Sequence, residues 1–404
     1  MATMKGEPVD RPAVSFYEIG GWKMEQDKDD YTVWNDPTWR PLVQMAHEET
    51  DLIRMVSASW IGGSDRGFSD LVTNTSWRKE NSRFTRTEIR APGRTLTSLT
   101  RRDRDIQTVW KLEHLLKSVE DAEAYLRLPE PTIGEVDISF IAAQEEELGD
   151  AGIVSVEFGD PICSVAGMFS MEDYTVMAMT EPRLFHRLLE RFARTFFPKC
   201  EQLSKAFPGR LWRTCGSEYA SEPYLPPRLY EEYVERYTGP IVKTIQKYGG
   251  YSRIHSHGRL KGILPAIARM APDGLDPLEP PPQGDTHLWE IKEAIGKDTV
   301  LMGNIEAADI ENMRPLEFER KVATALREGT TRGARGFILH PSACPYGRII
   351  TQQTMELTHK LNLNAKNYGG KTEIGSVEKR IGRPFRHCGC FCYAKWGILP
   401  DHTL

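Results

Sequence analysis

Short hydrophobic runs recur along the chain, and each is followed by a longer stretch with apolar residues at helical spacing. Runs of this kind that end in polar or small residues are typical of β-strands. Eight of them occur, beginning at Ala13, Asp51, Ile153, Arg210, Tyr251, Gly274, Thr299 and Gly336. Strand and helix alternating eight times predict a (β/α)8 TIM barrel.

The longest helix-like stretches support this alternation. Residues 181–207 keep an apolar stripe, residues 226–248 open with two prolines, and residues 315–333 end in glycine. An open doubly wound sheet is the competing fold. It would normally carry a glycine-rich phosphate turn after an early strand, and the sequence contains neither G-x-G-x-x-G nor a P-loop pattern.

Two regions depart from the alternation. Residues 81–112 alternate polar and apolar positions around "APGR", which predicts a β-hairpin inserted after the second strand. Residues 364–404 look irregular and form a Cys-rich tail. We therefore expect a catalytic barrel over residues 1–363, with the hairpin as an insert, and a separate C-terminal tail.

Composition narrows the function classes. The chain has 404 residues, a hydrophobic fraction of 40% and a net charge of −5 with both signs interspersed, which favours neither nucleic acid nor a membrane surface as a partner. The N-terminus has no apolar signal-peptide core. Seven cysteines is an odd number spread over a long chain, so a disulfide framework is not expected. These features predict a reduced, cytoplasmic protein.

The predicted barrel places its active site at the carboxyl ends of the strands. The fifth strand ends in His255 and His257, which point the same way in an extended segment and can bind one ion as a pair. Cys344 follows the eighth strand and can supply a third ligand, as zinc sites prefer imidazole and thiolate. Glu218, after the fourth strand, is a candidate fourth ligand or general acid/base. The alternative is that the histidines are ordinary polar residues at a strand end.

Other strand ends supply candidate substrate contacts: Glu18, Trp22, Phe158, Asn304, Glu306 and Tyr346. The carboxylates and the amide can equally be rim residues, and the aromatic side chains can equally be packing. In the tail, Cys388, Cys390 and Cys392 follow His387 at a spacing tighter than that of structural zinc sites. A second metal site and adventitious surface thiols both remain open there.

Three stretches carry a family resemblance: residues 7–22, residues 216–258 and residues 300–345. Together they resemble the uroporphyrinogen decarboxylase superfamily over roughly residues 7–363, which implies the same barrel. One branch decarboxylates uroporphyrinogen without a metal and holds substrate carboxylates with an early R-Q-A-G-R segment. Here that segment reads "YEIGGW", and without its arginines a polyanionic tetrapyrrole lacks cationic partners.

The sequence is more similar to the other branch, the zinc- and cobalamin-dependent methyltransferases. Their zinc pattern is His-x-Cys followed by a distant cysteine. His255 and Cys344 match that pattern, whereas His257 stands where the family has its first cysteine. Two neutral histidines and one thiolate leave zinc with a net charge of about +1, which strengthens it as a Lewis acid. Such a site suits polarising a methyl ether, so the resemblance implies O-demethylation that feeds a corrinoid.

The resemblance also implies partners. The chain has no separate domain for cobalamin, so a corrinoid protein is expected to dock over the barrel, with the 81–112 hairpin as a docking element, a lid or a simple rim insert. A small-molecule methyl donor is the second partner, and a homodimer stays open. Two rival functions remain. One is a metal-free lyase that clamps a carboxylic acid with Arg253, Arg259 and Arg348; the other is a non-catalytic protein that binds a corrinoid or tetrapyrrole.

Overall fold

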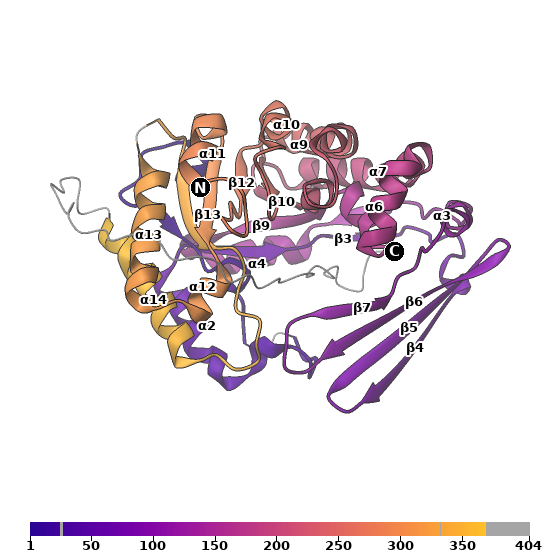
Figure 1. Cartoon of the computed structure of the whole chain (residues 1–404), viewed down its shortest axis with the longest axis horizontal. Helices are drawn as coiled ribbons and strands as arrows, with labels where there is room; N and C mark the ends of the chain where they lie inside the picture. Colours follow the sequence, from indigo (N-terminus) through magenta and orange to yellow (C-terminus); the bar gives the residue numbers. More distant parts are fainter. Residues whose placement is uncertain (25–26, 332, 369–404) are drawn as a thin grey trace.

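Eight parallel strands form a closed (β/α)8 barrel in the computed structural model, which describes residues 1–24, 27–331 and 333–368. The predicted fold class is confirmed, and each of the eight predicted runs contains one barrel strand (Figure 1). In chain order the strands are β1 (Ala13–Val14), β2 (Leu52–Val56), β9 (Gly152–Gly159), β10 (Leu211–Cys215), β11 (Tyr251–His255), β12 (Gly274–Asp276), β13 (Val300–Ile305) and β14 (Phe337–Pro341).

The hydrophobic pattern explains why these strands lie inside. All residues of β12, β13 and β14 are buried, as expected for parallel strands covered by helices on one side and by the barrel interior on the other. Neighbouring strands are in register along the sheet: His255 lies beside Asp276, and Asn304 lies beside His340. The register therefore brings polar residues from successive strands to one end of the barrel.

The seam between β1 and β2 is closed by Asp51. Val14 N–H donates to Asp51 Oδ2 at 2.8 Å, and Asp51 N–H donates back to the Val14 carbonyl at 2.7 Å. Arg11 Nη1 also donates to Asp51 Oδ2, at 2.7 Å. Because β1 contains only two residues, this carboxylate carries much of the pairing that closes the barrel.

One main helix follows each strand and packs outside the sheet (Figure 1). These helices are α2 (Arg40–Glu49), α4 (Ser139–Leu148), α7 (Pro182–Ala206), α9 (Arg236–Lys247), α10 (Leu264–Met270), α11 (Leu288–Ile295), α13 (Pro315–Thr330) and α14 (Gln352–Tyr368). Shorter helices add to them: α1 (Ala2–Lys5), α3 (Val119–Tyr125), α5 (Pro161–Ala166), α6 (Met171–Thr180), α8 (Pro227–Tyr230) and α12 (Ala307–Asn312). The predicted stretch 181–207 is α7, which starts with a proline and buries Phe185, Leu188 and Leu189.

The insert between β2 and β9 is larger than the predicted hairpin. Its centre is the hairpin of β5 (Ser82–Ala91) and β6 (Arg94–Asp103), which turns at the "APGR" stretch as expected. Two further strands, β4 (Val72–Lys79) and β7 (Val109–Glu113), flank it in an antiparallel sheet of four. This sheet projects beside α3 (Figure 1). In the sequence it is flanked by two short strands, β3 (Ser59–Ile61) and β8 (Glu135–Asp137), which pair with each other in antiparallel orientation.

The predicted start of the tail needs correction. Residues 364–368 are not irregular, because they form the last turn of α14, which buries Leu361 and Ala365 against the barrel. Residues 369–404, including the three tail cysteines, lie outside the described residues, so the expected tail and its metal site stay predictions.

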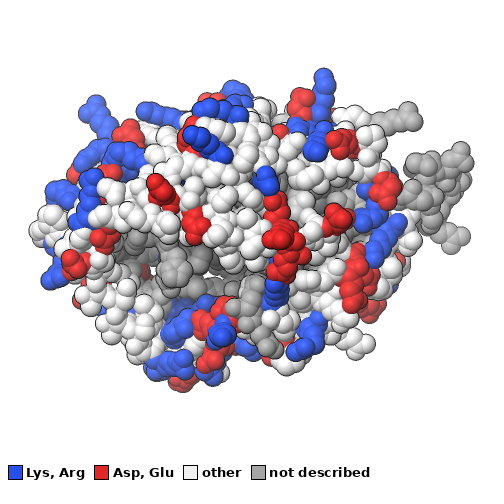
Figure 2. Space-filling view, turned by 180° about the vertical axis from the view of Figure 1, so that it is seen from behind, with Lys and Arg blue, Asp and Glu red and all other residues white. Residues whose placement is uncertain are grey.

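Charged side chains of both signs lie on the surface. On the face opposite to that of Figure 1, basic and acidic side chains are interspersed (Figure 2). No helix among the described residues is both long and apolar enough to cross a membrane.

Candidate functional site

His255 ends β11 inside the barrel and is completely buried. Its Nδ1 lies 2.7 Å from Asp276 Oδ2, and the Tyr17 hydroxyl lies 3.2 Å from Nδ1 and 3.4 Å from Nε2. Burial and the nearby Arg213 lower the pKa of His255 well below its ordinary value. A neutral ring that donates from Nδ1 to Asp276 and accepts at Nε2 from Tyr17 satisfies all these groups.

Tyr17 is the centre of a polar network that fills this end of the barrel. Its ring stacks on His255 and on His340, with centroids 5.7 Å and 5.4 Å apart. Arg213 Nη2 donates to the Tyr17 hydroxyl at 2.6 Å, and Arg213 Nη1 donates to Glu157 at 2.5 Å. The network holds His255 in one orientation and one tautomer.

His257 lies two residues further on, at the barrel mouth, which we define as the opening at the carboxyl ends of the barrel strands. Its ring is nearly perpendicular to that of His255, with centroids 4.5 Å apart. Nδ1 lies 2.6 Å from Glu279 Oε1, and the other carboxylate oxygen of Glu279 accepts from Gly258 N–H at 2.5 Å. Burial opposes protonation, yet Glu279 raises the pKa of His257 to about 9.

Glu218 stands beside His257 on a 3₁₀ turn, Ser217–Ala220, that directly follows β10. The residue is 7% exposed, and its Oε2 is buried without a hydrogen-bond partner. Burial raises its pKa, while the charge of His257 opposes that shift. A buried carboxylate oxygen with no protein partner is free to accept from a substrate or to bind a cation.

Glu306 and Tyr346 line the same opening. Ser342 Oγ donates to Glu306 Oε2 at 3.2 Å, and Glu306 Oε1 is buried without a partner. Burial and the charge of Glu279 raise the pKa of Glu306 to about 8. Tyr346 lies close enough to Glu18, Cys344, Glu279 and Glu306 for their charges to raise the pKa of its hydroxyl, an effect that adds to burial.

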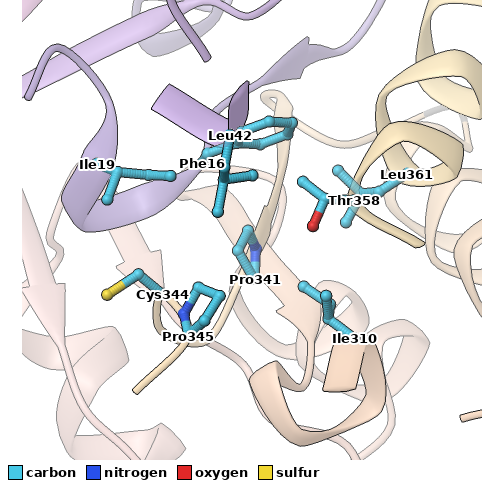
Figure 3. Close-up of a pocket in the computed structure, with 9 residues that line it drawn as sticks. All are labelled: Phe16, Ile19, Leu42, Ile310, Pro341, Cys344, Pro345, Thr358 and Leu361. Carbon is cyan, nitrogen blue, oxygen red and sulfur yellow. The ribbon is translucent and has the colours of Figure 1, made fainter. Parts of the chain in front are cut away.

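Cys344 lies at the edge of the mouth and is 2% exposed. Its N–H donates to Glu18 Oε2 at 3.2 Å. Its backbone borders a narrow apolar gap beneath α14, and its sulfur points away from the other lining side chains (Figure 3). The gap is lined by Phe16, Ile19, Leu42, Ile310, Pro341, Cys344, Pro345, Thr358 and Leu361.

Three further predicted site residues have different surroundings. Phe158 packs edge-on against Phe196 of α7 and against Trp212, in the layer between sheet and helices. Trp22 packs edge-on against Trp34, with ring centroids 4.5 Å apart. Asn304 is 7% exposed, beside His340 in the sheet.

The three arginines of the lyase hypothesis have different surroundings. Arg253 is buried and pairs with Asp276 at 3.2 Å, Arg259 is exposed and pairs with Glu222 at 3.6 Å, and Arg348 donates to the Asp30 carbonyl. Each arginine already pairs with or donates to another group of the protein, so the lyase hypothesis gains no support from their positions.

Sequence reasoning missed four residues of this site: Tyr17, Arg213, Asp276 and Glu279. The two carboxylates could have been predicted, because both lie in the sixth predicted strand run, "GLDPLEP". The same strand-end rule that selected the histidines selects them. Tyr17 and Arg213 carried no such signal, since an aromatic residue and a strand arginine look like packing residues.

The types of side chain at the mouth suit a zinc ion, but the distances between these side chains do not. Both histidines bond a buried carboxylate through Nδ1, which is how metal-binding histidines are usually oriented. Within the described residues, however, no group of three or more His, Cys, Asp or Glu side chains is close enough together to hold a metal ion. His255 would also have to give up Tyr17 at Nε2. A zinc site here therefore requires side-chain movement.

A parallel barrel with ionisable groups at the carboxyl ends of its strands is the architecture of (β/α)8-barrel enzymes. The family model of uroporphyrinogen decarboxylase (URO-D) matches residues 111–354. This chain belongs to the uroporphyrinogen decarboxylase family, which confirms the resemblance seen in its sequence. No curated protein sequence matches it significantly.

Two solved structures are among those that match this chain. A methyltransferase from Methanosarcina mazei matches with a TM-score of 0.53 and 12% sequence identity, covering 91% of this chain and 97% of that chain. D-Psicose 3-epimerase from Clostridium cellulolyticum H10 matches with a TM-score of 0.30 and 9% identity, covering 55% of this chain and 80% of that chain. At 12% identity the likeness to the methyltransferase concerns the fold alone.

Proposed function

We propose that this protein is a zinc-dependent methyltransferase that moves a methyl group between a small donor and a corrinoid. The favoured donor is a methyl ether such as an O-methylated aromatic, and a partner protein presents the corrinoid at the barrel mouth. The family membership supports an enzyme, and the methyltransferase fold of the Methanosarcina mazei protein agrees with this reaction class.

The acidity of the mouth is the observation that carries the proposal. Glu18, Glu218 and Glu279 contribute carboxyl groups there, Glu306 adds one that is protonated at neutral pH, and Glu218 and Glu306 each have a buried oxygen without a partner. Such an opening repels a polyanionic substrate and attracts a cation. A neutral ether and a metal ion are therefore better suited to it than a polycarboxylate.

His257, Glu218 and Cys344 are the proposed zinc ligands, with His255 as a further candidate. When bound, zinc would supply a Lewis acid for polarising the oxygen of the methyl donor. The chain's own residues have other tasks. Glu279 orients His257, Tyr17 and Asp276 fix His255, and Glu306, whose pKa of about 8 keeps it protonated at neutral pH, can give its proton to the leaving oxygen.

Metal content and methyl transfer should be measured together. We expect about one zinc per chain by elemental mass spectrometry, lost in His257→Ala. His186→Gln is the matched control, because His186 lies on α7 and bonds Tyr237 and Glu232 away from the mouth. With reduced cobalamin and a panel of methyl ethers, the zinc-loaded protein should form methylcobalamin.

Other results would overturn the proposal. Zinc that survives in His257→Ala places the metal elsewhere. Release of carbon dioxide from a carboxylic acid, unaffected by a chelator, would establish the lyase instead. Tight corrinoid binding with no methyl transfer across the panel would establish a non-catalytic binding protein.

A further inference from the structure

Two cysteines from different elements meet next to the mouth. Cys163 lies in the first turn of α5, and Cys215 is the last residue of β10. The two thiols lie close enough to interact, and Cys215 and burial both raise the pKa of the Cys163 thiol. They are far apart in sequence, so the pair is a product of the fold.

The backbone holds them at close range. Gly216, directly after Cys215, has a φ of 118°, and a Cβ added there would lie 2.2 Å from the Cβ of Cys163. Only glycine permits this approach. On the other side, Asp160 caps α5 by accepting from Cys163 N–H at 2.8 Å and is itself fixed by Thr238 Oγ1 at 3.0 Å. Neither element can move away without breaking these contacts.

The surroundings distinguish this pair from the other described cysteines. Cys163 and Cys215 are only half-buried, whereas Cys200 and Cys344 are 0% and 2% exposed. Lys111, whose amine donates to the Gly167 carbonyl at 2.6 Å, is close enough to Cys163 for their charges to interact. The pair is thus more accessible than the other two described cysteines. Lys111 offsets part of the negative charge that Asp160 and Glu218 place near Cys163.

We propose that Cys163 and Cys215 are a reversible dithiol–disulfide site that reacts with small disulfides such as oxidised glutathione. One protein thiolate attacks a glutathione sulfur, breaks its S–S bond and releases one glutathione. The second protein thiol gives up its proton and displaces the other glutathione. In sum, one S–S bond breaks and one forms, and two electrons pass from the protein to glutathione, which leaves as two thiols.

A disulfide between Cys163 and Cys215 would restrain part of the candidate site at the barrel mouth. Cys215 is joined through Gly216 and Ser217 to Glu218, so a disulfide ties the turn that carries Glu218 to α5. The inference does not depend on methyl transfer, because the bond forms whether or not the mouth binds zinc.

The test is disulfide mapping of the native, full-length protein. After incubation with oxidised glutathione, free thiols are alkylated and peptides are analysed by mass spectrometry. We expect a cross-linked peptide pair containing Cys163 and Cys215, which disappears on later reduction. Cys200→Ser, the matched control, should keep the cross-link.

The single variants Cys163→Ser and Cys215→Ser should instead stop at a glutathione adduct on the remaining cysteine. Recovery of both native peptides in alkylated form would overturn the proposal, as would pairing of either cysteine with Cys388, Cys390 or Cys392. Because the cross-link is sought in the unmodified protein, the result does not depend on the variants folding.

Discussion

Buried ionisable side chains concentrate at one end of this molecule, and their partners decide their charge. His255 and His257 are two residues apart, yet the pKa of the first is lowered by burial and that of the second is raised by Glu279. Two histidines of one strand end can therefore hold different protonation states at neutral pH. This difference follows from which carboxylate and which arginine each ring meets.

Glu279 should set the behaviour of His257. In Glu279→Gln the carboxylate charge is lost, so we expect the pKa of His257 in the metal-free protein to fall from about 9 toward its ordinary value, as measured by NMR titration of labelled histidine. Zinc binding should weaken by about 10-fold to 100-fold, since partners that orient a ligand have effects of this size. The control is Glu222→Gln, an exposed carboxylate paired with Arg259. An unchanged titration of His257 would contradict the assignment.

Asp160 should make stability depend on pH. Burial raises its pKa from 3.8 to about 7, so the folded chain binds more protons than the unfolded chain between these values. Its contribution is complete below about pH 4 and is lost as pH rises through about 7, on the order of 4 kcal/mol in all.

Asp160→Asn keeps the cap and removes this titration. The variant should therefore gain stability relative to the parent as pH rises from about 4 to about 7, measured by urea unfolding. A constant difference between the two proteins over that range would show that Asp160 titrates normally.

The sequence predicts some strands of the fold and misses others. All eight barrel strands were predicted because each is a short apolar run bounded by polar or small residues. β4 was missed because most of its side chains are exposed, so no hydrophobic face marked it as a strand. The strand-end rule could have selected Asp276 and Glu279, but their pairing with His255 and His257 could not be predicted from it. Contacts between strands, such as His255 beside Asp276, are absent from a linear pattern.

Asp29 forms ion pairs that connect the inserted sheet to the barrel. Asp29 accepts from Arg83 at 2.7 Å and 3.1 Å, and from Arg102 at 3.4 Å. We expect Asp29→Asn to lower the local stability of β5 and β6 by roughly 1–2 kcal/mol, since hydrogen bonds to charged groups contribute about this much. Hydrogen exchange of β5 and β6 amides should then accelerate about tenfold, while β13 is unaffected.

Asp30→Asn is the control for this element. Its side chain is 61% exposed and pairs with Arg104 at 3.4 Å, so solvent screens the interaction. Equal acceleration in both variants would mean that the sheet is not held through Asp29.

Closure of the whole barrel depends on Asp51. Asp51→Ala leaves Val14 N–H and Arg11 without their acceptor, so global stability should fall by about 2–3 kcal/mol in urea unfolding. Asp51→Asn keeps a side-chain oxygen that can accept from Val14 N–H, so its global stability should fall by less. If the alanine variant unfolds like the parent, the seam must be closed by other contacts.

The pairing of β1 with β14 also fixes an order of events during synthesis. Ala13 pairs with Ile338 and Val14 with Leu339, so the first barrel strand to leave the ribosome waits for the last one. Contacts between such distant parts of a chain are slow to form. Until β14 emerges, one edge of β1 and one edge of β13 lack the strand that pairs with them, and a growing chain with open strand edges is a natural client for chaperones.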